Sequence, residues 1–226
     1  MIARRRRALL LVALLPVLYA LLSYLLLPDL WYERDESRPL AEMLTRTADD
    51  LAGDPINVEI VGARSALVAA MNAAGWAPAD PITARTSADI IGSVLLDRPY
   101  RDAPVSPLFY DGRREDLAFE KAAGISADRR QHVRLWAMGG DGGQARWLGA
   151  VTFDAGVGLS HYTGQVTHDI SPRIDDARQA LVSDLEATGL VAQTSSIAGR
   201  GATDKGRNGE GDLYVTDGRA ALLVLR

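Results

Sequence analysis

The sequence predicts an α+β fold: a largely antiparallel sheet built from hairpins, with three or so packed helices, preceded by one N-terminal transmembrane helix. Three observations predict it. A charge-free apolar run follows a cluster of arginines, several apolar runs are separated by short glycine-containing turns, and amphipathic stretches carry helix start and stop signals. Because turns join the strands and the helices lie elsewhere, the pattern indicates an antiparallel sheet and not a doubly wound nucleotide-binding fold.

The N-terminal segment has the features of a membrane anchor. Residues 8–27 carry no charge, and at a helical rise of ~1.5 Å per residue they span about 30 Å, the thickness of a bilayer core. Arg4–Arg7 precede this run, and Trp31 and Tyr32 follow it where an interfacial aromatic belt belongs. A cleaved signal peptide would need a shorter apolar core and a small-residue cleavage site. The sequence therefore favours an uncleaved anchor.

The positions of the charges also predict the topology. Arginines ahead of the helix keep residues 1–7 in the cytoplasm, so the rest of the chain is exported. We expect a single-pass membrane protein with its globular domain outside the cytoplasm, and in a bacterium the membrane would be the inner membrane. The chain has no cysteine, which excludes disulfides, thiol catalysis and cysteine-ligated metals.

The exported part is acidic. Without the four anchor arginines, 21 basic residues stand against 29 acidic ones, a net charge of about −8. A nucleic-acid partner is excluded because phosphate backbones require a clustered basic face. The cell membrane is the predicted partner. The glycine-rich runs lack the Gly-Lys-Ser/Thr of a phosphate-binding loop, and no Gly-x-Ser-x-Gly marks a nucleophile.

Helices are predicted from apolar periodicity and from their boundary residues. A stalk over residues 28–54 precedes the globular domain at 55–226. The best marked helix has Ser171 as its N-cap, Pro172 in its first turn and Gly189 past its end. The predicted helices are residues 41–51 in the stalk, then 63–75, 81–100 and the segment between Ser171 and Gly189.

Strands are predicted from β-branched apolar runs and from turn residues. Residues 55–62 read as a buried strand, and residues 145–154 are apolar on both faces, as in a central strand. The glycine-rich residues 198–212 are predicted to form a flexible surface loop. Three hairpins are predicted, with turns at Asp111-Gly112, at residues 139–144 and at Asp217-Gly218.

Four segments together resemble one known family: PVSPLFYDGRREDLAF, RRQHVRLW, VTHDISPRIDDARQALVSDL and YVTDGR. They are similar to the LssY C-terminal domain family, over residues 55–226. Members of that family are exported or membrane-attached bacterial proteins. The resemblance therefore implies an envelope location and this fold, and it implies no reaction.

One strand carries the candidate site. His132 and Arg134 lie on the same face of the strand that enters the second hairpin, because side chains alternate along a strand. A suitable register would bring these residues beside a carboxylate, and a shift of one residue would separate them. The alternative is a solvated sheet face on which arginine stems cover apolar surface. The suitable register pairs Arg134 with Ala150, His132 with Thr152, and Arg130 with Asp154.

The candidate residues fall into two roles. A zinc site made of His132, His168 and Asp154 lacks any His-x-His or His-Glu-x-x-His spacing, so neither a metal nor another cofactor is predicted. Asp175 is also expected to complement the dipole of its helix. The candidate catalytic residues are His132, His168 and Asp154, and the candidate binding residues are Arg134, Arg178, Asp175 and Arg113. Six of them are expected to line one pocket: His132, Arg134, Asp154, His168, Asp175 and Arg178.

Two functions follow from this set, and the residues leave open whether the protein is an enzyme. The first is an envelope-associated binding or accessory module that recognises an anionic lipid or polysaccharide headgroup. The second is a phosphoester or ester hydrolase with His132 or His168 as general acid or base.

Overall fold

The computed structural model describes residues 12, 14–27, 45–48, 50–79, 107–123, 129–139, 145–160, 164, 166–201 and 204–226. The helix predicted over residues 81–100 lies outside the described residues, and so do residues 1–7 and residues 28–44 of the predicted stalk.

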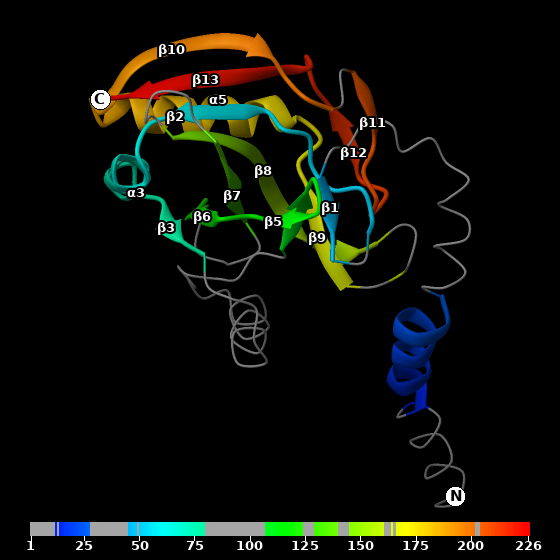
Figure 1. The fold of residues 1–226 in the computed structure, drawn as a ribbon. Coiled ribbons are helices and arrows are strands. Elements are labelled where there is room, and N and C mark those ends of the chain that lie inside the picture. Colours follow the sequence, from blue (N-terminus) through cyan, green and yellow to red (C-terminus); the bar gives the residue numbers. More distant parts are fainter. Residues whose placement is uncertain are drawn as a thin grey trace, which may run out of the picture.

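An eight-stranded sheet forms the centre of the fold (Figure 1). Its order is β10-β13-β2-β8-β7-β6-β3, with β9 paired to β8. The pair β13–β2 is parallel and the other pairs are antiparallel, which confirms the predicted sheet type. The strands are β2 (Val58–Val61), β3 (Ala77–Pro78), β6 (Leu117–Ala122), β7 (Arg130–Met138), β8 (Arg146–Leu159), β9 (Val166–Ile170), β10 (Val191–Ala198) and β13 (Arg219–Leu225).

Two helices cover one face of this sheet (Figure 1). They are α3 (Arg64–Ala73) and α5 (Ile174–Ala187), and both were predicted. Each ends before a glycine with positive φ, Gly75 and Gly189, which allows the chain to leave the helix without strain. The predicted N-cap is wrong, because Arg173 and not Ser171 precedes α5. The main core includes Val58, Ile60, Leu67, Met71, Trp76, Phe119, Val133, Leu135, Val151, Leu181 and Leu185.

A small sheet lies against the opposite face. It has the order β1-β4-β5, with β1 (Thr45–Thr47), β4 (Leu108–Tyr110) and β5 (Arg113–Arg114). A second core joins it to the large sheet and consists of Ile56, Leu108, Trp136, Leu148 and Ala150. The faces of β7 are therefore both buried, one by the helices and one by this second core.

The second predicted hairpin is confirmed, whereas the first is confirmed only at its turn, because the apolar run at residues 117–122 pairs with β7 and not with β4. Asp111 and Gly112 both have positive φ and join β4 to β5, as a type I′ turn requires. The strands β7 and β8 pair across the second hairpin.

The helix predicted over residues 41–51 is wrong where the chain is described, because residues 45–47 form β1. The hydroxyl of Thr45 hydrogen-bonds the backbone of Asp54. Threonine side chains that bond the backbone in this way compete with the hydrogen bonds of a helix.

The third predicted hairpin is wrong. The turn at Asp217-Gly218 separates β12 (Leu213–Val215) from β13, and these strands belong to different sheets. β12 pairs with β11 (Lys205–Arg207), whereas β13 pairs with β10. Residues 205–207 lie in the segment predicted to be a flexible loop. A two-residue turn marks a change of direction, but it does not determine which strands become partners.

The N-terminal described residues are helical and end in a π-helical turn, η1 (Leu22–Leu26). The hydroxyl of Tyr19 donates to the carbonyl oxygen of Gly164 at 2.6 Å. Within the described residues, no helix is long and apolar enough to cross a membrane. The predicted anchor at residues 8–27 includes residues 8–11 and 13, which lie outside them.

Candidate functional site

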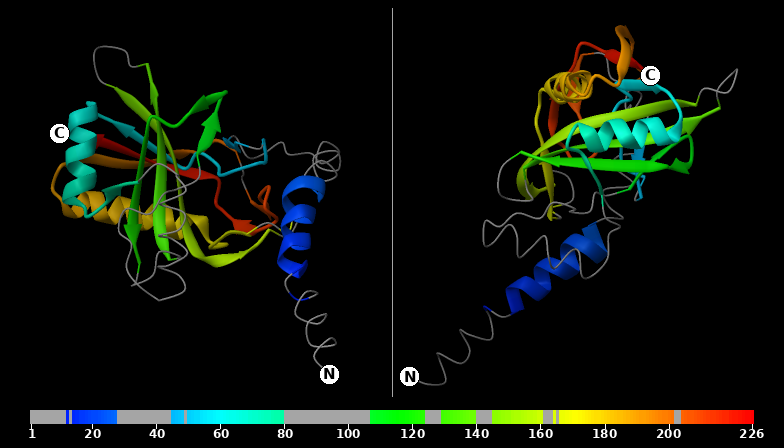
Figure 2. Two further views of the ribbon diagram at one scale, coloured as in Figure 1. Left: turned by 90° about the horizontal axis from the view of Figure 1, so that it is seen from below. Right: turned by 90° about the vertical axis from the view of Figure 1, so that its left-hand side faces the viewer.

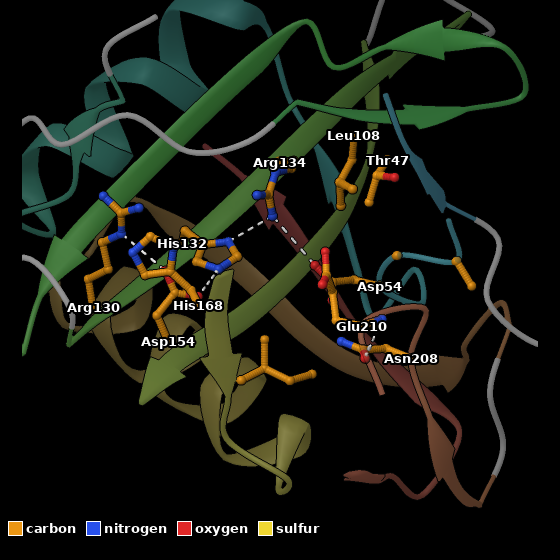
Figure 3. Close-up of a pocket in the computed structure, with 13 residues that line it drawn as sticks. Thr47, Asp54, Leu108, Arg130, His132, Arg134, Asp154, His168, Asn208 and Glu210 are labelled. Carbon is orange, nitrogen blue, oxygen red and sulfur yellow. Dashed lines mark hydrogen bonds and ion pairs between the residues drawn. The ribbon is translucent and has the colours of Figure 1, made fainter. Parts of the chain in front are cut away.

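A polar cavity of about 100 Å³ lies between the large sheet, residues 47–54, β4 and the turn that joins β11 to β12 (Figure 3). Four of the six residues predicted to share a pocket line it: His132, Arg134, Asp154 and His168. They come from β7, β8 and β9. The remaining lining residues are Thr47, Ala52, Gly53, Asp54, Leu108, Arg130, Ile170, Asn208 and Glu210.

The register of β7 on β8 is the one that groups the charged side chains. His132 and Arg134 are both buried, so the alternative of a solvated sheet face is wrong. On β8 the register shifts between Asp154 and Gly156, where β9 begins to pair. Such bulges are frequent beside functional sites because they redirect a side chain. The structure pairs Arg134 with Ala150, His132 with Thr152, and Arg130 with Asp154, as predicted.

Arg130 and Asp154 form the inner part of a buried ionic network. The guanidinium of Arg130 donates to Asp154 Oδ2 at 3.2 Å through Nε and to Glu120 Oε2 at 2.8 Å. The other oxygen of Asp154, Oδ1, lies 2.7 Å from Nε2 of His132. All four side chains are buried. Asp154 is therefore held between a cation and an imidazole.

The contacts of His132 determine its tautomer. A nitrogen of Arg134 lies 2.8 Å from Nδ1 of His132. Arginine has only donors, so Nδ1 must accept, and the ring proton of the neutral imidazole lies on Nε2. Nε2 then donates to Asp154. Both ring nitrogens are consequently used inside the network, and Thr152 Oγ1, 3.1 Å from Nε2, lies against the same ring.

Asp54 completes the network from the segment that precedes β2. Its Oδ2 lies 3.4 Å from Arg134 and 3.4 Å from the hydroxyl of Thr152. The backbone of Asp54 is fixed by Thr45, whose hydroxyl accepts from its N–H and donates to its carbonyl oxygen, both at 2.7 Å. This close approach requires a glycine before Asp54, since a Cβ on Gly53 would lie 2.6 Å from the Thr45 hydroxyl.

A turn between β11 and β12 forms the remaining side of the pocket. Oδ1 of Asn208 accepts from the N–H groups of Glu210 and Asp212 at 3.1 and 2.9 Å. The N–H of Gly209 donates to the carbonyl oxygen of Ala52 at 2.8 Å. Figure 3 shows Asn208 and Glu210 on the same side as Asp54, and Arg130 and His168 on the opposite side. The turn is thus fixed against the segment that carries Asp54.

Burial and charge have opposite effects on the ionisable groups. Burial raises the pKa of the Asp154 carboxyl, but its neighbours His132, His168 and Arg130 together hold that pKa below its usual value. Burial lowers the pKa of Arg134, against the opposing effect of Asp54 and other carboxylates. An arginine stays protonated in proteins nonetheless. The pocket therefore contains cations and carboxylates together.

The other three predicted binding residues lie elsewhere, so the single six-residue pocket is wrong. Arg178 is paired with Asp217 at 2.9 Å and with Asp175 at 3.1 Å. Asp175 also accepts from the backbone N–H of Asp217 and thereby fixes the start of the turn before β13. Arg113 pairs with Asp116 at 3.0 Å on the β4–β5 hairpin. Helix α5 covers the sheet face opposite His132, which separates its charged residues from the pocket.

Four functional side chains were missed as candidates. The predicted register placed Arg130 opposite Asp154, on the same face as His132, but Arg130 was not named among the candidates. Asp54 belongs to the predicted stalk, and Asn208 and Glu210 belong to the predicted flexible loop. No periodicity marks these three, since they reach the pocket only through the tertiary fold. The described residues contain no group of three or more His, Asp or Glu arranged to hold a metal ion.

Comparison with known proteins gives one match. A family model, described as the LssY C-terminus, matches residues 38–220, which is most of the chain. No curated protein matches, and no solved structure matches.

Proposed function

The chain belongs to the LssY C-terminus family, and from this premise we propose that it is a binding module of the bacterial cell envelope. Residues 8–27 anchor it in the inner membrane, and its globular domain lies outside the cytoplasm. The ligand is the anionic headgroup of an envelope lipid or polysaccharide, and its anionic group enters the pocket beside Arg134.

The buried ionic network is the observation that supports this proposal. Transferring charges from water into a protein interior is unfavourable, and apolar side chains of the same volume often stabilise a fold as well or better. Arg130, His132, Arg134 and Asp154 are nevertheless all buried around one cavity. Clusters of this kind are typical of functional sites, where the charges serve recognition or catalysis.

The size of the cavity limits what it can hold. Pockets for whole small molecules usually measure ~300–1,000 Å³, whereas this one measures about 100 Å³. A compact group such as a phosphate or carboxylate therefore suits it better than a complete sugar. Arginine offers up to five N–H donors in a planar fork that matches such groups. The adjacent carboxylates Asp54 and Glu210 would repel additional negative charge, which favours an anion with a single charge.

A hydrolase is the alternative function, and the position of His168 favours it. His168 lines the pocket and contributes to the lowered pKa of Asp154. His132 is less suited to act as a general base, because Arg134 and Asp154 occupy both of its ring nitrogens. The nearby hydroxyl of Thr152 is completely buried, so it is also poorly placed to act as a nucleophile. The geometry thus supports binding better than hydrolysis.

We expect Arg134→Ala to weaken the binding of inorganic phosphate at least tenfold, since a hydrogen bond to a charged group contributes about 1.5–3 kcal/mol. Isothermal titration calorimetry of the purified chain measures this. Arg178→Ala is the matched control and should change affinity less than about twofold, because Arg178 lies outside the pocket. Arg134→Lys keeps the charge but not the fork, so we expect intermediate affinity.

Equal phosphate affinity in the wild type and in a folded Arg134→Ala variant would contradict the pocket as the anion site. Release of p-nitrophenol from p-nitrophenyl phosphate separates the two functions. Hydrolysis that disappears in His168→Asn would favour the hydrolase, and absence of turnover together with Arg134-dependent binding supports the module.

The proposed topology predicts the behaviour of a fused reporter. A reporter that is active only after export should be active when it is fused after Arg226, because Arg4–Arg7 retain the N-terminus in the cytoplasm. The fusion protein should also stay in the membrane fraction at high salt. Activity of a cytoplasm-only reporter at the same position would refute this arrangement.

A further inference from the structure

We infer that the outer face of the β11–β12 ribbon docks on an anionic lipid surface and brings the pocket to the headgroups of that surface. This inference rests on the proposed membrane anchoring and identifies the lipid bilayer as the source of the ligand. It assigns a role to four side chains outside the pocket: Lys205, Arg207, Leu213 and Val215.

The register of the ribbon places these four side chains together. Lys205 stands opposite Val215, and Arg207 stands opposite Leu213. Residues directly opposite each other in an antiparallel pair project from the same face of a sheet. Tyr214 lies between the two apolar residues and therefore points to the other side. Two cations and two aliphatic side chains thus share one face of the ribbon.

This face is exposed, and the other face is fixed to the domain. Leu213 is 55% exposed and Val215 is 51% exposed. Tyr214, in contrast, is buried and packs with Ala52 and Ile174. The N–H of Val215 also donates to the carbonyl oxygen of Pro172 at 2.6 Å. The ribbon therefore presents its basic and apolar side chains on a supported surface.

The charge of this face differs from the charge of the domain. The chain outside the anchor carries a net charge of about −8, so an anionic bilayer repels most of it. Lys205 and Arg207 make this face attractive to the same bilayer. Exposed aliphatic side chains beside basic ones are typical of surfaces that enter the boundary between headgroups and acyl chains. A lipid surface therefore complements this face in both charge and polarity.

The ribbon is connected directly to the pocket. The turn between its strands carries Asn208 and Glu210, which line the cavity. The hydroxyl of Ser160, at the end of β8, donates to the carbonyl oxygen of Glu210 at 3.3 Å, and Leu159 beside it is exposed. Figure 1 shows β9, β11 and β12 on the side of the domain nearest the N-terminal helix, and Figure 2 gives two further views. Docking of the ribbon would therefore place the pocket close to the membrane.

A single fluorescent label tests this docking in the full chain. The chain has no cysteine, so Val215→Cys creates a unique site for an environment-sensitive dye. The labelled chain is inserted into vesicles of phosphatidylglycerol or of phosphatidylcholine, and insertion is verified by flotation. We expect a blue-shifted emission and protection from iodide quenching in phosphatidylglycerol only. A label at Leu190→Cys, between α5 and β10, should report water in both lipids.

Removing the positive charges of Lys205 and Arg207 should weaken the docking to phosphatidylglycerol vesicles. Lys205→Gln combined with Arg207→Gln is expected to lower the docking equilibrium constant about 30-fold, from the attraction of two basic residues to an anionic surface. Phosphate binding should stay within about twofold of the wild type in Lys205→Gln alone, because Lys205 does not line the pocket. Arg207 donates to the carbonyl oxygen of Gly211 in the turn that carries Asn208 and Glu210, so the double variant does not serve as this control.

Two outcomes overturn the inference in different ways. In the first, the labelled chain floats with vesicles but its emission is the same in both lipids, or is the same in the wild type and in the doubly substituted variant. This result refutes the docking and leaves the anchor and the pocket in place. A chain that does not float with phosphatidylglycerol vesicles refutes the anchor and the docking together.

Discussion

Asp154→Asn is expected to lower the free energy of unfolding by about 3–5 kcal/mol, the usual effect of removing one partner from a buried ion pair. The carboxylate accepts from Arg130 at 3.2 Å and from His132 at 2.7 Å. Asparagine has nearly the same shape, but it offers one acceptor, and its NH₂ group would face donors. Arg130 would then keep a buried positive charge with one carboxylate partner fewer. Urea unfolding at pH 7, followed by tryptophan fluorescence, measures the loss.

Asp176→Asn is the matched control. Asp176 is paired with Arg173 at 2.8 Å, but its side chain is 62% exposed, and exposed ion pairs contribute only ~0–1 kcal/mol. A loss in Asp154→Asn no larger than the loss in this control would show that the buried network does not stabilise the folded state.

The pH dependence of the same variant has a defined sign. The pKa of Asp154 is lowered in the folded state, so its carboxylate stabilises the fold above the unfolded pKa of ~3.9, and this contribution is lost as the pH falls further. The difference in stability between the wild type and Asp154→Asn should therefore be constant between about pH 5 and 7 and should shrink below about pH 4.

The part of the fold that could be predicted from sequence depends on local information. Helix α5 was predicted because Ile174, Ala177, Leu181 and Leu185 repeat along one face and Gly189 follows its end. The β7–β8 hairpin was predicted in the same way, since alternation and a glycine-rich turn lie within one continuous segment. These signals depend on residues that are neighbours in the chain.

The pairing of β13 shows why other parts were not predicted. Its partners are β10 and β2, and the turn at Asp217-Gly218 is equally compatible with a local hairpin. β10 is a polar edge strand whose sequence, VAQTSSIA, has no apolar alternation long enough to predict it. Distant pairing is determined by the packing of the whole sheet, and a short stretch of sequence does not contain that information.

The same distinction applies to the candidate site. His132, Arg134 and Asp154 were predicted together because one hairpin carries all three. Asp54 lies 80 residues from its partner Arg134, so only the folded chain brings the two together. Arg178 and Asp175 do pair with each other, as residues three apart on a helix can. Their helix lies on the opposite face of the sheet because its apolar stripe packs into the main core.

Arg130→Met is expected to lower the free energy of unfolding by about 3–5 kcal/mol at pH 7. Arg130 is the cation that bonds both Glu120, at 2.8 Å, and Asp154, at 3.2 Å. Methionine preserves most of the buried stem but leaves two buried carboxylates without this partner. Chemical unfolding of the variant and the wild type, measured from pH 7 to about pH 3, gives both the loss and its pH dependence.

The pH dependence of this variant should resemble that of Asp154→Asn. Arg130 is one of the groups that hold down the pKa of Asp154, so its removal allows that pKa to rise in the folded variant. Arg130 is only one of several groups that lower this pKa, so the carboxylate stays ionised near neutral pH in both folded proteins, and in the variant it takes up its proton earlier as the pH falls below the unfolded value of ~3.9. The difference from the wild type should therefore stay constant between pH 7 and pH 5 and should shrink only below about pH 4, where Asp154 of the variant is protonated before that of the wild type. A loss that does not shrink below about pH 4 would mean that Arg130 stabilises the fold by packing its stem and not by its charge.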